Sequence, residues 1–248
     1  MNKTTNLETI KTVAKSLLRV PVLKTEYSPM IVSHPFTKCG IVTVLNGNDF
    51  FQLDITQNEE SFNKWVAQMS KFIDEADSVY HIYHMLNDSY CLMFFDSISK
   101  YLSEQDSATL LGESWVSSES ANVDANVSKN KMLSYFKAAN KQLLMSESEL
   151  ESFNDFDDQV VVYRGVSSRN KNHTKALSWT TSFGKADWFA KRWDNGIVYS
   201  ATIDKQHIFA YFDRKDEDEV IVDFNQLKNI KITTKPLPKP EPTSIEKQ

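Results

Sequence analysis

Apolar side chains recur at helical spacing in two segments of the N-terminal half. In residues 7–18 they fall three or four positions apart, and Pro21 follows where the helix should end. In residues 59–76 the same spacing produces one stripe of Phe, Trp, Met, Val and Ile side chains. The pattern predicts two amphipathic helices, and a stripe of this kind is more typical of core packing than of a ligand site.

A β-hairpin is predicted between these two helices. Apolar runs at residues 40–45 and 50–55 flank the turn sequence Asn46-Gly47-Asn48. Asn-Gly accepts the positive φ that tight hairpin turns need, so the two runs should pair in the antiparallel sense.

The central region changes from hydrophobic to polar. Residues 80–102 are hydrophobic, and their spacing predicts a helix from Tyr90 onward. Residues 115–128 form the least apolar interior stretch and are predicted to be a long ordered loop. We expect its Asn and Asp side chains, Asn122 among them, to bond their own backbone.

The C-terminal half begins with a helix and continues with strands. Ser128 is a suitable N-cap for a helix that should reach Met145. A β-branched run at residues 160–162 predicts a buried strand, residues 185–193 predict a further helix, and residues 227–234 predict a closing strand.

Composition narrows the class of protein. The chain has 248 residues, 41% of them hydrophobic, and a net charge of -5, which argues against a broadly basic surface that coats nucleic acid. Its two cysteines provide neither a disulfide framework nor a cysteine-rich zinc site, and its histidines form no HExxH motif, so we expect no metal. The first residues lack an apolar signal core and no run reaches membrane-spanning length, which predicts a cytoplasmic protein without membrane association.

Three short polar clusters stand at the edges of strands predicted in residues 159–224. They are Tyr163-Arg164-Gly165, Ser178-Trp179-Thr180 and Glu217-Asp218-Glu219. An Arg where a strand stops can hold a phosphate through two parallel hydrogen bonds. Glu217 and Glu219 leave on one face if strand pairing reaches them, and neighbouring carboxylates resemble an acid/base or cation-stabilising site. Each cluster alone is more often a surface ion pair or a solvated turn. The occurrence of all three in this order, with strands between them, favours a functional site.

This order of residues resembles the Arg-Ser-Glu class of mono-ADP-ribosyltransferases. Arg164 stands at a strand end, Ser178 and Thr180 are similar to the Ser-Thr-Ser element of that class, and Glu217 and Glu219 match its Glu-x-Glu. The resemblance covers roughly residues 132–223. Thr180 departs from the usual second Ser but keeps a hydroxyl.

The resemblance implies a role for each of these residues. Arg164, with Gly165 beside it, would hold a phosphate of NAD. Ser178, with Thr180, would bond near the nicotinamide ribose and position the catalytic carboxylate. Glu219 would stabilise the cation that forms when nicotinamide leaves, and Glu217 would orient or deprotonate the acceptor. The six glycines form neither a GxGxxG nor a P-loop, so NAD would be a consumed substrate rather than a hydride carrier.

The acceptor is predicted to be a macromolecule. In the family, a Glu at the position of Glu217 usually accompanies arginine acceptors, which favours protein arginine. Similar small prokaryotic and phage enzymes, including toxins of antiphage toxin–antitoxin systems, modify RNA bases, so an RNA acceptor and an antitoxin partner stay open. Residues that fit an RNA acceptor are the basic residues of one loop and three tryptophans: Arg169, Lys171, His173 and Lys175, with Trp179, Trp188 and Trp193. Core packing is the stronger expectation for Trp188.

A non-catalytic binding module is the remaining alternative.

The fold class predicted from these elements is α+β, with mostly antiparallel strands and flanking helices. We expect an N-terminal α+β region in residues 1–84 and an ADP-ribosyltransferase-like catalytic domain in residues 85–234. The tail, residues 235–248, is rich in Pro and charge and is predicted to be disordered.

Overall fold

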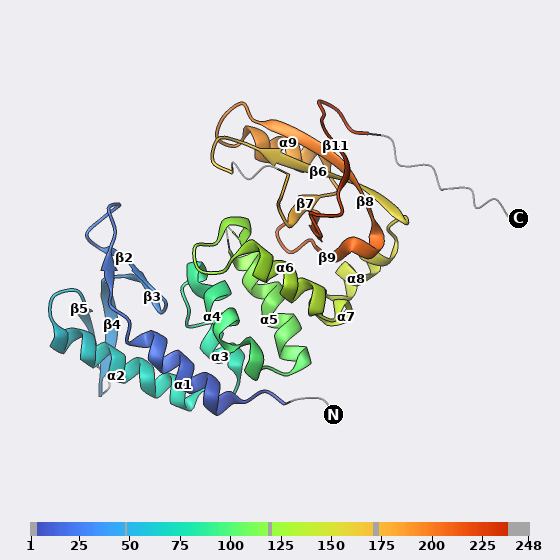
Figure 1. Ribbon diagram of the computed structural model, residues 1–248. Coiled ribbons are helices and arrows are strands. Elements are labelled where there is room, and N and C mark those ends of the chain that lie inside the picture. The colour runs from blue at the N-terminus through green and yellow to red at the C-terminus, as the bar shows by residue number, and fades with distance from the viewer. Residues whose placement is uncertain (1–3, 48, 119–120, 171–173, 238–248) are drawn as a thin grey trace, which may run out of the picture. The chain divides into compact units, whose positions relative to one another are not determined.

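The protein is an α+β fold whose chain divides into two compact units. The computed structural model describes residues 4–47, 49–118, 121–170 and 174–237. The first unit comprises Met1–Leu110 and Ser117–Glu119, and the second comprises Leu111–Val116 and Ser120–Gln248 (Figure 1). The division falls at residue 110 rather than at the expected residue 84, because α4 (Cys91–Ile98) packs against α1 (Leu7–Leu18) in the first unit.

The first unit contains the two predicted amphipathic helices and the predicted hairpin. Its strands and long helices are α1, β1 (Leu23–Lys24), β2 (Ile31–His34), β3 (Thr37–Cys39), β4 (Ile41–Asn46), β5 (Asp49–Asp54), α2 (Glu59–Glu75), α3 (Val79–Tyr83) and α4. Asn6 caps α1, and its side chain accepts a hydrogen bond from the backbone N–H of Thr9. β4 and β5 pair antiparallel around Gly47 at φ 64°, which confirms the hairpin.

The second unit is built on one antiparallel sheet. Its elements are α6 (Lys129–Ala138), α7 (Lys141–Leu144), α8 (Glu147–Asn154), β6 (Gln159–Val166), β7 (Ser178–Thr180), α9 (Phe183–Lys191), β8 (Ile197–Asp204), β9 (Ile208–Phe212), β10 (Glu219–Val222) and β11 (Lys228–Ile232). The strand order is β11-β8-β6-β7-β10-β9, and every neighbouring pair in it runs antiparallel. β7 and β10 thus lie side by side inside the sheet, which brings two of the polar clusters together.

Helix α9 lies against β6 at very short range. A Cβ placed on Gly165 of β6 would lie 2.1 Å from the carbonyl oxygen of Ala186 and 2.6 Å from the backbone nitrogen of Ala190. Both alanines are buried, so small residues on both elements allow this close approach. β6 also continues past Arg164 to Val166, so the expected strand end at Arg164 is wrong.

Several central elements differ from the prediction. Residues 115–117 are the last turn of a helix, α5 (Glu104–Ser117), rather than the start of a loop. Its apolar residues face more than one side and Gly112 interrupts them, so the sequence shows no clear stripe. The helix that begins after Ser128 ends at Ala138, because Ala139 and Asn140 are extended before α7.

Candidate active site

Glu219 is the first residue of β10, which lies between β7 and the edge strand β9. It pairs with Thr180 of β7 on one side and with Phe212 of β9 on the other. Its carboxylate Oε1 accepts a hydrogen bond of 3.1 Å from the indole Nε1 of Trp115 in α5, and the Ser178 side chain also hydrogen-bonds it. Two donors therefore fix one carboxylate in a defined orientation.

The environment of Glu219 raises its pKa to about 7. Burial is the main cause, and the nearby charge of Glu217 adds to it. The hydrogen bonds from Ser178 and Trp115 and the positive charge of Arg164 act in the opposite direction. In the ligand-free protein near neutral pH, this carboxyl is therefore divided between its protonated and ionised forms, as is common at functional sites.

Arg164 reaches the same place from β6. Its guanidinium Nη1 donates a hydrogen bond to the backbone carbonyl of Ser178, the residue whose side chain bonds Glu219. Burial lowers the pKa of Arg164 to about 10, and the negative charge of Glu219 opposes that shift. Arg164 is thus charged at any physiological pH and interacts electrostatically with the carboxylate.

Lys129 adds positive charge near Arg164, and Lys175 adds charge beside Lys129. Lys129, the first residue of α6, donates a hydrogen bond through its Nζ to the backbone carbonyl of Lys175. The pKa of Lys129 is lowered by burial, and further by the charges of Lys175 and Arg164. Lys129 is partly buried and is repelled by both Lys175 and Arg164. An anion beside it would relieve that repulsion, which makes this cluster suited to phosphate.

Glu217 stands outside the strand that begins at Glu219. Asp218 between them has a positive φ of 46°, so the two glutamates do not follow the alternation of a strand. Strand pairing reaches Glu219 but not Glu217, and the condition for a shared face is not met. The hydroxyl of Thr180 donates a 2.8 Å hydrogen bond to the carbonyl oxygen of Glu217, which holds it beside β7. Burial raises the pKa of the Glu217 carboxyl, while the charges of Lys215, Arg192 and Lys185 lower it.

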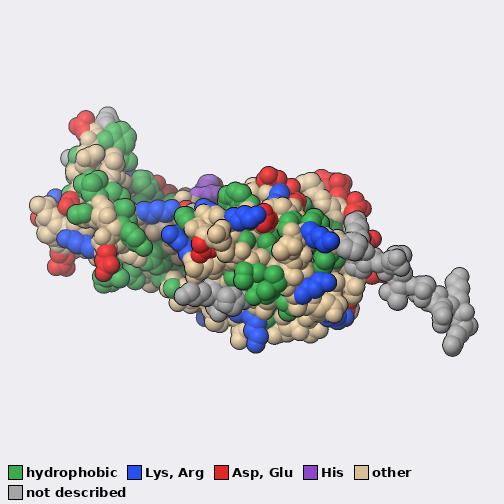
Figure 2. All heavy atoms as spheres, turned by 90° about the horizontal axis from the view of Figure 1, so that it is seen from above, with side chains coloured by type: hydrophobic (Ala, Val, Ile, Leu, Met, Phe, Trp, Pro, Cys, Tyr) green, Lys and Arg blue, Asp and Glu red, His purple; other side chains and the backbone are tan. Residues whose placement is uncertain are grey.

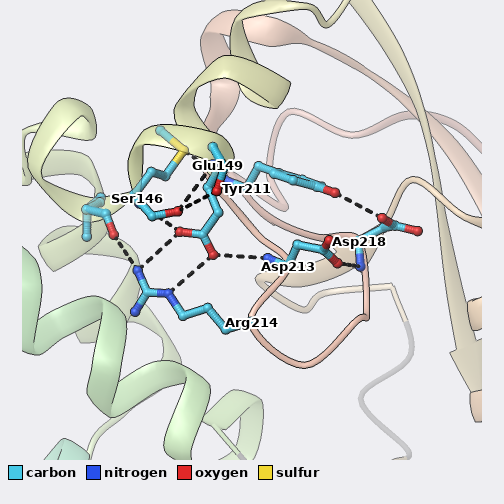
Figure 3. A network of polar contacts seen from close by, with 9 residues as sticks. Ser146, Glu149, Tyr211, Asp213, Arg214 and Asp218 are labelled. Carbon is cyan, nitrogen blue, oxygen red and sulfur yellow. Dashed lines mark hydrogen bonds and ion pairs between the residues drawn. The ribbon is translucent and has the colours of Figure 1, made fainter.

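A polar network holds the turn before β10 in this conformation (Figure 3). The Tyr211 hydroxyl donates a 2.9 Å hydrogen bond to Asp218 Oδ1, and Lys185 pairs with Asp218 Oδ2 at 3.2 Å. At the other end of the turn, the buried Glu149 accepts from the backbone N–H of Asp213 at 3.1 Å. These contacts offset the cost of the left-handed backbone at Asp218, which is on the order of 1 kcal/mol.

The same Glu149 anchors the turn through Arg214. Arg214 Nε lies 3.2 Å from Glu149 Oε1, and its Nη2 donates to the carbonyl of Leu144 at 3.0 Å. Glu149 also completes a capping box with Ser146 at the start of α8. The turn that presents Glu217 and Glu219 is therefore tied to the helical part of its unit.

Most of the site residues named from the sequence meet in space. Arg164, Ser178 and Glu219 form one group of interacting polar side chains, and the charge of Glu217 acts on Glu219. Gly165 and Thr180 do not belong to this group of interacting side chains. Gly165 allows α9 to pack closely against β6, and Thr180 hydrogen-bonds the backbone of Glu217. Both are explained by packing and hydrogen bonding within the protein.

Sequence reasoning missed three residues of the site. Trp115 falls in the predicted loop at residues 115–128, and nothing in the sequence singles out Lys129. Asn122 does not bond its own turn: its Oδ1 accepts from the backbone N–H groups of Leu177 and Ser178 at 2.9 and 3.2 Å and so positions the start of β7. No short motif marks these residues, because their partners are 46 to 104 positions away in the chain.

Comparison with known proteins leaves the family open. No protein-family model, curated protein or solved structure matches this chain. Within the described ranges, no group of three or more His, Cys, Asp or Glu side chains could hold a metal ion. None of the helices described is long and apolar enough to cross a membrane.

Proposed function

We propose that this protein is an NAD-dependent ADP-ribosyltransferase that releases nicotinamide and transfers ADP-ribose to a macromolecule. One observation carries the proposal: a carboxylate, Glu219, is held by Trp115 and Ser178 beside a partly buried guanidinium, Arg164. Lys129 near Arg164, and Lys175 beside Lys129, supply charge for the pyrophosphate of NAD.

The arrangement fits the chemistry of that reaction. The bond that breaks joins the nicotinamide nitrogen to ribose C1′, and its electron pair leaves with nicotinamide. Positive charge then develops on the ribose, where a fixed carboxylate stabilises it. An acceptor nucleophile attacks C1′ and gives up its proton, for which Glu217, the second carboxylate of the turn, is the candidate base.

The raised pKa of Glu219 is consistent with this role. Burial holds part of the carboxyl in its neutral form while the site is empty. A cationic nicotinamide riboside beside it would favour the ionised form, because an opposite charge lowers a carboxyl pKa. The negative charge is thus most stable when the substrate is present.

The test is an incubation of the protein with NAD labelled in its adenylate part and with whole-cell extract. Nicotinamide release is measured by chromatography, and the labelled macromolecules are digested separately with ribonuclease and with protease. Release together with labelled macromolecule supports the proposal, and the digestion that removes the label identifies the acceptor. Absence of both with the wild-type protein, while a known NAD glycohydrolase works in the same extract, would leave a binding module as the better explanation.

A further inference from the structure

Two tryptophans at the C-terminal end of α9 are exposed to solvent. Trp188 is 57% exposed and Trp193 is 53% exposed, whereas Trp179 is buried. The expected core packing of Trp188 is therefore wrong. The reason is helical geometry: Ala186 and Ala190 face β6, and a residue midway between them points to the opposite side.

Arginine side chains lie over these indole rings. The Arg169 guanidinium carbon is 4.0 Å from the centre of the Trp193 ring, and that of Arg192 is 5.0 Å from Trp193 and 5.3 Å from Trp188. The loop that carries Arg169 is fixed to this end of the helix, since the Ser168 N–H donates a 3.0 Å hydrogen bond to Asp194. We call these four side chains the Trp–Arg surface.

The Trp–Arg surface carries positive charge available to an outside partner. Lys191 on the same helix is paired with Asp187. Arg169 acts electrostatically on Asp194, but within the described residues neither Arg169 nor Arg192 lies within ion-pair distance of a carboxylate. Figure 2 shows Lys and Arg side chains next to exposed hydrophobic side chains on the second unit. Lys171 and His173, which the sequence had added to this group, lie outside the described residues.

The surface also reaches the candidate active site. Lys185, one turn before Trp188 in α9, pairs with Asp216 at 2.7 Å and with Asp218 at 3.2 Å, so α9 lies beside the turn that carries Glu217. The positive charge of Arg192 also acts on the Glu217 carboxyl. A molecule bound over Trp188 and Trp193 is therefore adjacent to the group that we assign to the acceptor.

We infer that the Trp–Arg surface binds single-stranded nucleic acid and presents it to Glu217 as the ADP-ribose acceptor. Exposed indoles and guanidinium planes stack on unpaired bases, and the guanidinium charges pair with phosphates. A duplex hides its base faces within its own stack, and an arginine-rich peptide would meet like charge at Arg169 and Arg192. The acceptor role rests on the proposed transferase activity; the binding itself does not.

Binding is therefore tested without NAD. Fluorescence anisotropy of dye-labelled oligouridine and oligodeoxythymidine of about 12 nucleotides measures the affinity of the full chain, with a blunt duplex of equal length alongside. Both single strands should bind more tightly than the duplex. A tighter complex with RNA would assign a role to the 2′-hydroxyls, and equal binding would assign recognition to bases and phosphates alone.

Substitutions then locate the binding site. Trp188→Ala and Trp193→Ala should each weaken single-strand binding by about 5-fold or more, whereas Trp188→Phe should retain most of it. Arg192→Ala should weaken binding and make it less dependent on salt. The control is Tyr27→Ala in the first unit, an aromatic that is 89% exposed and should leave the affinity unchanged.

The inference is overturned if the wild-type protein binds neither single strand, or if both Trp→Ala variants bind as the wild type does while their thermal melts confirm folding. Binding of an arginine-rich peptide in place of the oligonucleotides would instead support a protein acceptor. Failure of this test leaves NAD cleavage unaffected, and a failure of NAD cleavage leaves this binding measurable.

Discussion

The indole nitrogen of Trp115 donates a hydrogen bond of 3.1 Å to the Glu219 carboxylate, across 104 positions of the chain. The Trp115 ring is held by an edge-to-face contact with Phe136, with ring centres 5.2 Å apart. A packed helix therefore fixes the donor that favours the ionised form of the candidate catalytic carboxylate.

Trp115→Phe removes this donor while keeping an aromatic ring against Phe136. The pKa of Glu219 should rise above its value of about 7, because a hydrogen bond to the charged form has been lost. In the wild type, kcat/KM for nicotinamide release should fall below pH 7, and in the variant this fall should begin at a higher pH. Stopped assays from pH 5 to 9 measure both profiles. An unchanged profile would show that Trp115 does not act on Glu219.

Glu219→Gln and Glu217→Gln should separate the two half-reactions. The first should abolish nicotinamide release and transfer alike, with a loss of at least about 100-fold, since the developing cation loses its counter-charge. The second should leave NAD hydrolysis close to wild type and lose transfer to the acceptor. Release and transfer are measured in the same reaction with doubly labelled NAD. Equal loss of both activities in the two variants would contradict this division of roles.

Arg164→Lys should weaken NAD binding by about 10-fold, because an ammonium group cannot reproduce two parallel hydrogen bonds to one phosphate. Calorimetric titration in the Glu219→Gln background avoids turnover during the measurement. The matched control is Lys11→Arg in the first unit, a change between the same two residue types that should leave the affinity as it was. If the Arg164→Lys variant binds NAD as tightly as the Glu219→Gln protein, Arg164 interacts with Ser178 and Glu219 but does not bind the nucleotide.

The pKa of Glu219 also predicts how stability changes with pH. Its folded value of about 7 lies above the value of about 4.3 expected for an unfolded chain, so the folded protein binds the extra proton between these values. The protonated form therefore contributes stability at low pH that is lost as the pH rises toward 7. Glu219→Gln carries no such charge, and its Tm should exceed that of the wild type more at pH 8 than at pH 4. Parallel Tm curves for the two proteins would exclude a raised pKa.

Gly165→Ala tests whether this glycine serves packing. Its added methyl group would lie 2.1 Å from the Ala186 carbonyl oxygen, so we expect a loss of stability of about 1–3 kcal/mol. Gly184→Ala, in α9 itself, is the matched control: the nearest atom is 3.8 Å away, and the change should stabilise the helix by about 0.5–1 kcal/mol. Urea unfolding of both variants measures the difference. A Gly165→Ala variant as stable as the wild type would show that α9 can shift.

Local pattern predicted the elements whose signal lies within a few residues. The helix at residues 7–18 and the hairpin around Gly47 were confirmed because their apolar spacing and turn chemistry are contained in the segment itself. α5 was missed because it buries residues on more than one side, which removes the single stripe on which helix prediction depends. Trp188 was expected in the core because it is a large hydrophobic residue inside a helix. The sequence of this short helix does not show which of its faces packs against the sheet.

The sequence by itself determined an α+β protein with Arg164, Ser178 and Glu219 at strand positions, since strand propensity and residue chemistry are local properties. The tertiary structure alone decided which residues surround Glu219. Trp115 comes from α5 and Arg164 comes from β6, and their effects on the pKa of Glu219 depend on burial and distance. Hydrogen bonds and desolvation act through space between elements that the chain order separates, and for that reason no pattern of neighbours in the sequence contained them.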